Sequence, residues 1–264
     1  TIPNTQVKTR MGIQGINMPT VTFGNPTLNA DVAGITVSSQ LTPELGLTVF
    51  WARPYDRESV NGTAAEQRDG LNSLDDMDVF GFTLPIKTDV VRMTPWGMFA
   101  FIGKDSDFYT DFGGKAKYNY GQGLHNPYAG LHGGENKMDA TTYGWWLGTT
   151  FELPVLDPFF VKIDAMMGGL ETGESDYDTW GYLVAADIGY KFSWGSLSVA
   201  GWYASGNDDD DDLGFMPIIS DDGSTFAFTR YGIGGTTARS YDSMLSTNGI
   251  GMGGIGLKLR DLSF

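Results

Sequence analysis

The sequence predicts an all-β fold: an antiparallel, up-and-down β-barrel of about ten strands that crosses a membrane. Three observations predict it. Apolar side chains alternate with small or polar ones in many segments of the chain, the links between these segments alternate in length, and aromatic residues lie near both ends of the apolar face. Alternation with a period of two is typical of strands whose two faces meet different environments.

The alternation is clearest from Thr141 onward, where Tyr143, Trp145 and Leu147 alternate with small or polar residues. Two further segments, beginning at Phe159 and Trp180, repeat the pattern. Weaker alternation predicts the remaining strands, which are Val7–Asn17, Ala33–Leu41, Leu45–Arg53, Val79–Ile86, Val90–Lys104, Ser196–Ser205 and Thr247–Arg260.

The connectors are short and long in turn. The short links are 42–44, 87–89, 154–157 and 193–195, and the long loops are 18–32, 55–77, 105–139, 171–178 and 207–246. This order is typical of a barrel with short turns at one rim and long loops at the other. We therefore interpret residues 1–264 as a single barrel domain.

Segment length and aromatic placement distinguish this barrel from a soluble β-sandwich or propeller. The segments exceed the ~5–6 residues usual in globular sheets and fit the ~9–11 residues that cross a bilayer at a tilt. Tyr143 and Phe151, like Trp180 and Tyr190, place rings near both ends of one face. Such rings suit the boundary between membrane and water.

Composition excludes several classes of function. There is no cysteine, so disulfides, thiolate nucleophiles and cysteine metal sites are excluded. The net charge of −15 argues against binding nucleic acid. The five long loops hold 24 of the 32 acidic residues but only 7 of the 17 basic ones, so the strands and loops differ in character.

Strand phase predicts a polar interior. If the aromatic face meets lipid, the basic side chains of the strands point to the opposite side, where they avoid a cost of ~2–4 kcal/mol each. Some near strand ends, such as Lys104, Lys258 and Arg260, have snorkelling as an alternative. Arg53 breaks the phase at a strand end, where we expect snorkelling. The expected pore-lining residues are Lys8, Arg10, Arg92, Lys162 and Lys191 as a basic wall, with Asp164 and Asp187 as acidic members.

Several inward positions are nevertheless apolar. One interpretation is an aromatic track that stacks sugar rings, as in a saccharide-selective channel. We favour local packing under an inward-folded loop or a strand bulge, because a track needs a spatial order that the sequence does not give. The positions are Phe50, Trp96, Met98, Ile102, Trp146, Phe160 and Trp202.

The loop 105–139 is rich in aromatic residues and glycine, which argues against disorder. One hypothesis is that it folds into the barrel and sets Asp105, Asp107 or Asp111 across from the basic wall, where the field would sort solutes by charge. The alternative is a loop that packs over the rim or against a neighbouring subunit.

No enzymatic site is expected. Asp208–Asp212 is a run of carboxylates, and Asp208, Asp210 and Asp212 offer a weak possibility of loosely bound Ca²⁺. A solvated acidic surface, with loose bridging to lipopolysaccharide, is the favoured interpretation. The only histidines, His125 and His132, lie in one loop without a nucleophile motif, so a hydrolase is a minor alternative.

Several phrases of the chain resemble the outer membrane homotrimeric porin family of Desulfovibrio-type sulfate-reducing bacteria. The phrases are Ile2–Gln14, Ala33–Ser38, Thr48–Pro54, Gly206–Asp210 followed by Gly214–Pro217, and Gly256–Leu259. The resemblance implies a homotrimer of barrels, without cofactor, in the outer membrane. Because family members are longer, it also implies that this chain is part of a 16-stranded barrel, incomplete at both ends. The alternative is a closed ten-stranded barrel, whose interior would be largely plugged by side chains.

Together these observations predict a general diffusion porin that passes small hydrophilic solutes and ions across a bacterial outer membrane. The expected surroundings are membrane lipid and lipopolysaccharide, and the expected assembly is a homotrimer. The alternatives are a structural or adhesive barrel and a saccharide-selective channel.

Overall fold

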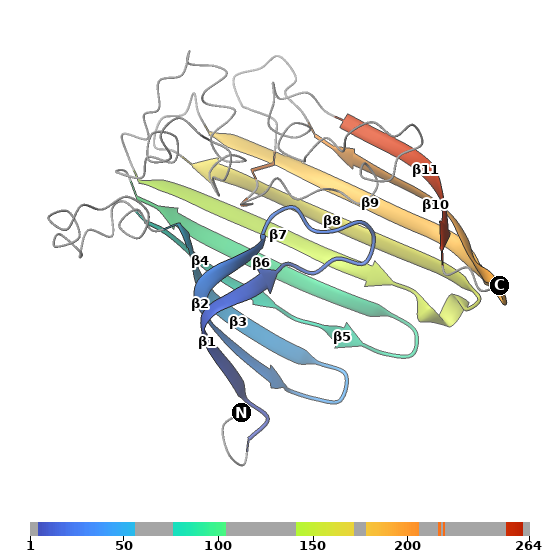
Figure 1. The fold of residues 1–264 in the computed structure, drawn as a ribbon, viewed down its shortest axis with the longest axis horizontal. Coiled ribbons are helices and arrows are strands. Elements are labelled where there is room, and N and C mark those ends of the chain that lie inside the picture. The colour runs from blue at the N-terminus through green and yellow to red at the C-terminus, as the bar shows by residue number, and fades with distance from the viewer. Residues whose placement is uncertain are drawn as a thin grey trace, which may run out of the picture.

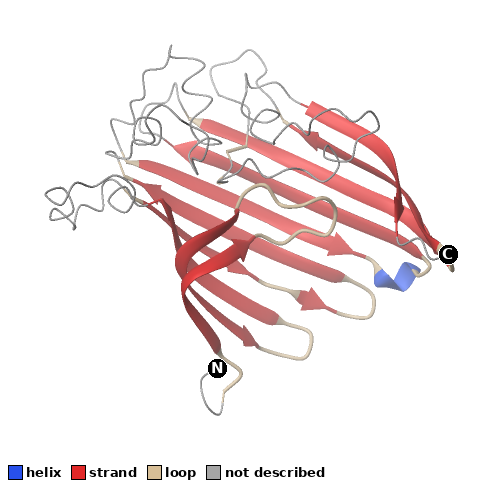
Figure 2. Ribbon diagram, viewed as in Figure 1, coloured by secondary structure: helices blue, strands red, loops and turns tan. Residues whose placement is uncertain are grey.

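The structure is a computed structural model. It describes residues 5–55, 76–103, 141–171, 178–205, 216, 217, 219 and 252–260. Within these residues the fold is an antiparallel, up-and-down β-sheet with almost no helix (Figures 1 and 2). The sheet has 11 strands in the order β1-β2-β3-β4-β6-β7-β8-β9-β10-β11, and the short β5 pairs with β6. Every long strand therefore lies beside its neighbours in sequence.

The strands match the predicted segments closely. They are β1 (Lys8–Asn17), β2 (Asn29–Gln40), β3 (Gly46–Tyr55), β4 (Met77–Thr83), β5 (Ile86–Lys87), β6 (Arg92–Ile102), β7 (Thr142–Glu152), β8 (Phe159–Glu171), β9 (Thr179–Phe192), β10 (Gly195–Ala204) and β11 (Met252–Arg260). Some predicted boundaries are wrong. β2 begins at Asn29, inside the segment expected to be a loop, and the strand expected at Val79–Ile86 is divided into β4 and β5.

Short turns join the strands at one edge of the sheet, which we call the short-turn edge. Thr42 stabilises the turn before β3, because its hydroxyl accepts hydrogen bonds from the backbone N–H groups of Glu44 and Leu45. Thr88 does the same for Val90 and Val91. The turn before β8 contains the 3₁₀ helix η3 (Pro154–Leu156). The opposite edge, where the expected long loops begin, is the long-loop edge.

The sheet has two unlike faces. One face is covered by the segment that joins β1 to β2, which crosses in front of β7 and β8 in Figure 1. We call this covered face the concave face and the other the outer face. Buried side chains lie on the concave face at every second position, as β9 shows with Thr179, Gly181, Leu183, Ala185 and Asp187. The intervening positions of β9 are largely exposed, so the predicted phase is confirmed for this strand.

Candidate functional site

The segment between β1 and β2 is held on the concave face, against β8, by one carboxylate. We call residues 18–28 the strap. The strap donates to Asp164 of β8 from Thr20 Oγ1 (2.8 Å), Val21 N (3.0 Å), Thr22 N (2.9 Å) and Thr22 Oγ1 (2.6 Å). Asp164 is only 1% exposed, and no described basic side chain forms an ion pair with it. Hydrogen bonds from the strap therefore replace the water that this carboxylate would otherwise bind.

The strap reaches a second strand and a second loop. Lys258 of β11 places its Nζ 3.4 Å from the centre of the Phe23 ring, a cation–π contact. Ile219 forms a parallel bridge with Leu28 and donates its backbone N–H to Thr27 O at 2.8 Å. Since β1 and β11 lie at opposite ends of the strand order, these contacts hold the two ends of the sheet toward one face.

Because glycine has no Cβ, two glycines leave room for large aromatic rings on the concave face. A Cβ at Gly148 would lie 2.8 Å from Trp96 Nε1 and closer to the ring carbons, and a Cβ at Gly144 would lie 2.6 Å from Trp146 Cη2. Trp146 also donates from Nε1 to Pro217 O at 2.7 Å. The apolar strap residues, Met216, Ile219 and these rings share one buried apolar cluster.

Most of the apolar inward positions are therefore covered rather than open to solvent. Phe50, Trp96, Met98, Ile102, Trp146 and Trp202 are all buried, whereas Phe160 is half-buried. This arrangement matches the favoured sequence interpretation, in which the rings pack under an inward-folded loop. Buried rings offer no accessible track to a sugar, so the structure gives no support to a saccharide-selective channel.

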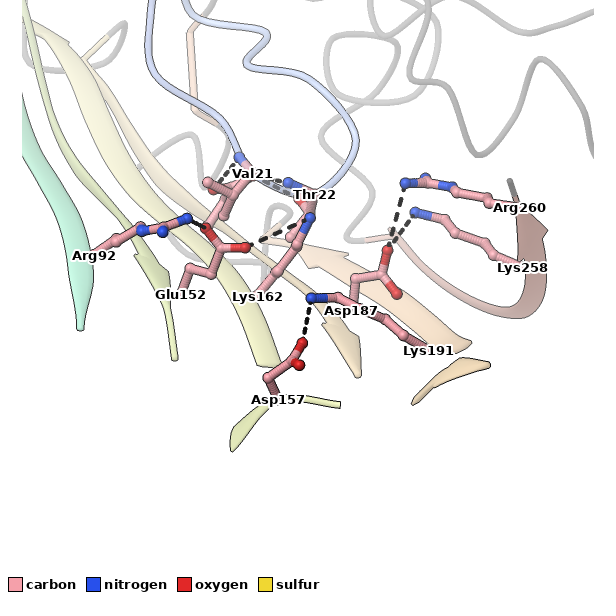
Figure 3. A network of polar contacts seen from close by, with 11 residues as sticks. Val21, Thr22, Arg92, Glu152, Asp157, Lys162, Asp187, Lys191, Lys258 and Arg260 are labelled. Carbon is pink, nitrogen blue, oxygen red and sulfur yellow. Dashed lines mark hydrogen bonds and ion pairs between the residues drawn. The ribbon is translucent and has the colours of Figure 1, made fainter. Parts of the chain in front are cut away.

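Charged side chains gather on the short-turn half of the concave face (Figure 3). Arg92 of β6 and Lys162 of β8 each lie 3.8 Å from Glu152 of β7. Asp187 of β9 is approached by Lys258 at 3.3 Å and by Arg260 at 4.0 Å, both from β11. Basic and acidic side chains thus alternate across β6, β7, β8, β9 and β11, and we call this row the charge ladder.

The structure brings some of the predicted wall residues together but not others. Arg92, Lys162 and Asp187 belong to the charge ladder, whereas Asp164 belongs to the strap contact. Lys191 pairs with Asp157 at 2.7 Å at the exposed short-turn edge. Lys8 and Arg10 are exposed residues of β1 and share the phase of the buried Gln14.

Asp164 and Asp187 differ from the expectation in exposure. Both carboxylates lie on the concave side, as the phase predicts, but they are only 1% and 2% exposed. Neither meets open water, because the strap covers the first, and the second is buried beside Lys258. Snorkelling was the alternative for Lys258 and Arg260 in the sequence analysis. Both side chains face this buried carboxylate.

The outer face of the described strands is largely apolar, and its charged side chains lie only near the long-loop edge. Phe99, Phe101 and Tyr143 form an aromatic group there, with ring centres 4.9–6.1 Å apart. Phe159, Tyr190, Phe192 and Trp194 form a second group near the short-turn edge, with successive centres 4.7–5.0 Å apart. Between these groups the outward positions of β9 are Val184, Ala186 and Ile188.

Arg53, which breaks the predicted phase, is paired on the outer face rather than snorkelling alone. It forms a bidentate contact with Asp78, at 3.0 and 2.8 Å, and an ion pair with Asp76 at 2.7 Å. Trp51 Nε1 donates to Asp78 at 2.9 Å. These residues lie at the long-loop edge, where the polar boundary of the face begins.

Other candidates lie outside the described residues. They are Asp105, Asp107 and Asp111 of the expected constriction loop, and Asp208, Asp210 and Asp212 of the weak Ca²⁺ possibility. Among the described residues, no group of three or more histidine or acidic side chains is placed to hold a metal ion. No described helix is long and apolar enough to cross a membrane.

The strap is the feature that sequence reasoning missed, because its contacts join residues far apart in the chain. A signal was present: residues 18–29 contain no charged side chain and include Met18, Val21, Phe23 and Leu28. A loop without charge and with large apolar residues is unusual at a solvated rim.

Comparison with known proteins adds no family assignment. No family model matches the chain, and neither a curated protein nor a solved structure matches it. The function proposed below therefore rests on the geometry of the two faces.

Proposed function

We propose that this chain forms the wall of a transmembrane β-barrel in a bacterial outer membrane and works as a general diffusion porin for small hydrophilic solutes and ions. The observation that carries the proposal is the difference between the two faces. Large apolar side chains are exposed on the outer face, while the charge ladder lies on the concave face. An exposed apolar surface of this extent is costly in water and favourable in lipid.

The spacing of the aromatic groups supports a membrane setting. Tyr182 and Tyr190 lie eight positions apart on β9, which is about 26 Å along a strand at ~3.3 Å per residue. A strand tilt of ~40° reduces this to about 20 Å across the membrane, close to the ~25 Å apolar band of outer-membrane barrels. Tyr182 and Tyr190 would then sit at the two boundaries between lipid and water.

The strap would narrow the passage. It is anchored to Asp164 of β8 and contacts Lys258 of the charge ladder through Phe23. In the proposed channel, solutes pass the strap and then the ladder, and no residue performs chemistry. Assembly as a homotrimer, surrounded by lipid and lipopolysaccharide, is part of the proposal and rests on the sequence resemblance.

A structural or adhesive barrel is the second candidate, and one specific observation favours it. The strap and Ile219 fill part of the concave face with buried apolar side chains, as a plug would.

Liposome swelling separates the two candidates. Vesicles that contain the refolded full chain are diluted into mono-, di- and trisaccharides of equal osmolarity. The porin proposal expects swelling rates that fall as the sugar becomes larger. A folded, inserted protein that gives no swelling with any sugar would contradict the porin and favour the structural barrel.

A further inference from the structure

The charge ladder contains more positive than negative charge. Two carboxylates, Glu152 and Asp187, are shared among four basic side chains. The four are Arg92, Lys162, Lys258 and Arg260. Since both signs come from strands held in fixed register, the excess is built into the wall.

Most of the contacts within the ladder are too long to be hydrogen bonds. Glu152 lies 3.8 Å from both Arg92 and Lys162, and Arg260 lies 4.0 Å from Asp187, whereas N–H···O bonds measure ~2.7–3.2 Å. Only Lys258 approaches its carboxylate more closely, at 3.3 Å. The donors of Lys162 and Arg260 are therefore not satisfied by these carboxylates.

The side chains around Asp187 are arranged unevenly. Lys162 is its cross-strand partner, yet Lys162 makes its ion pair with Glu152 on the other side. Lys258 and Arg260 both approach Oδ2 of Asp187, while Oδ1 is buried without a hydrogen-bond partner. One carboxylate, that of Asp187, thus lies beside three basic side chains, with Lys162 on one side and the Lys258–Arg260 pair on the other.

We propose that Lys162 and Arg260 bind a small oxyanion on the concave face, with Lys258 adding positive charge behind it. Lys162 and Arg260 are accessible, with 30% and 46% of their side chains exposed, whereas only 11% of the Lys258 side chain is exposed. The planar guanidinium suits two oxygen atoms of one phosphate or carboxylate, and the ammonium suits a third contact or the same group. Binding stands on these contacts, but the role of the oxyanion as a passing solute rests on the proposed channel.

The test is calorimetric titration of the refolded full chain with inorganic phosphate at low ionic strength, with acetate as a carboxylate arm. The wild-type protein is expected to bind one phosphate per chain. Lys162→Gln and Arg260→Gln each remove a charge-assisted contact and are expected to weaken binding about tenfold. Arg260→Lys keeps the charge but loses the planar fork, so an intermediate loss is expected.

Lys191→Gln is the matched control. It removes the same charge from the same side of the sheet, but Lys191 pairs with Asp157 at the exposed edge, so binding is expected to change less than about twofold. Three results would overturn the inference. They are no phosphate binding by the folded wild type, an equal loss in Lys191→Gln, or equal competition by chloride, a single atom that cannot offer two oxygen atoms to the guanidinium. Phosphate binding without liposome swelling would keep the site and remove the channel, whereas swelling without binding would do the reverse.

Discussion

Thr22 and Asp164 are separated by 142 positions in the chain, yet two hydrogen bonds join them, from the backbone N–H at 2.9 Å and from the hydroxyl at 2.6 Å. Thr22 belongs to the strap before β2, and Asp164 lies in β8 on the concave face. With the bonds from Thr20 and Val21, they make one buried carboxylate the anchor of the whole strap. Several predictions about stability and access depend on this anchor.

Removing the anchor carboxylate should destabilise the fold. Asp164→Ala leaves the half-buried N–H of Val21 and the buried N–H of Thr22 without an acceptor, and an unsatisfied buried donor costs about 1–3 kcal/mol. We expect a loss of roughly 2–4 kcal/mol in the free energy of unfolding, because relaxation of the strap recovers part of the cost. Urea unfolding of the protein in vesicles measures it.

Asp157→Ala is the control for that experiment. It also removes a carboxylate that has a partner, but 66% of the Asp157 side chain is exposed, so we expect a loss under about 1 kcal/mol. Equal losses in the two variants would show that the strap contact has no special weight.

The strap should also become accessible when the anchor is removed. Because the chain has no cysteine, Val21→Cys introduces a single thiol into the strap. In the otherwise unchanged protein we expect slow reaction with a water-soluble thiol reagent, and faster reaction, by about tenfold or more, when Asp164→Ala is added. Identical labelling rates in the two backgrounds would mean that Asp164 does not hold the strap.

The glycine under Trp96 should not tolerate a side chain. A Cβ at Gly148 would lie 2.8 Å from Trp96 Nε1, and the ring is buried. Gly148→Ala is therefore expected to cost about 1–3 kcal/mol through overpacking, measured by urea unfolding.

A second substitution tests the cause of that cost. Combining Gly148→Ala with Trp96→Leu makes room for the methyl group, so the double variant should lose less stability than the sum of the two single losses. Strict additivity would show that the ring and the glycine are not in contact.

The outer face should reject charge in the middle of a strand. Val184 lies on the outer face near the middle of β9, and Val184→Lys is expected to cost about 2–4 kcal/mol if that face meets lipid. Glu171→Lys, at the long-loop end of β8, is the control and should cost less than about 1 kcal/mol. Equal stability of Val184→Lys and wild type in vesicles would place this face in water.

The sequence predicted the strands well because a sheet with two different surroundings imposes a period of two. The segments expected at Val7–Asn17 and Ser196–Ser205 differ from β1 and β10 by a single residue at their ends. The same phase placed Lys162, Asp164 and Asp187 on one side, where the structure also has them. Strand phase is a local property, so one strand is enough to read it.

The partners of these side chains could not be predicted in the same way. The contacts of Asp164 with Thr22 and of Lys258 with Phe23 join residues far apart in the chain, and no local period encodes them. The burial of Asp187 likewise depends on the curvature of the sheet. The expected constriction at residues 105–139 stays a prediction, since it lies outside the described residues.

Conduction along the concave face is measured by single-channel conductance of the refolded full chain in a planar bilayer, with the reversal potential recorded across a KCl gradient. We expect discrete current steps, a reversal potential that shows anion preference because the charge ladder is positive, and larger steps in Asp164→Ala because the strap is released. A folded, inserted protein that gives no steps in either form would contradict it.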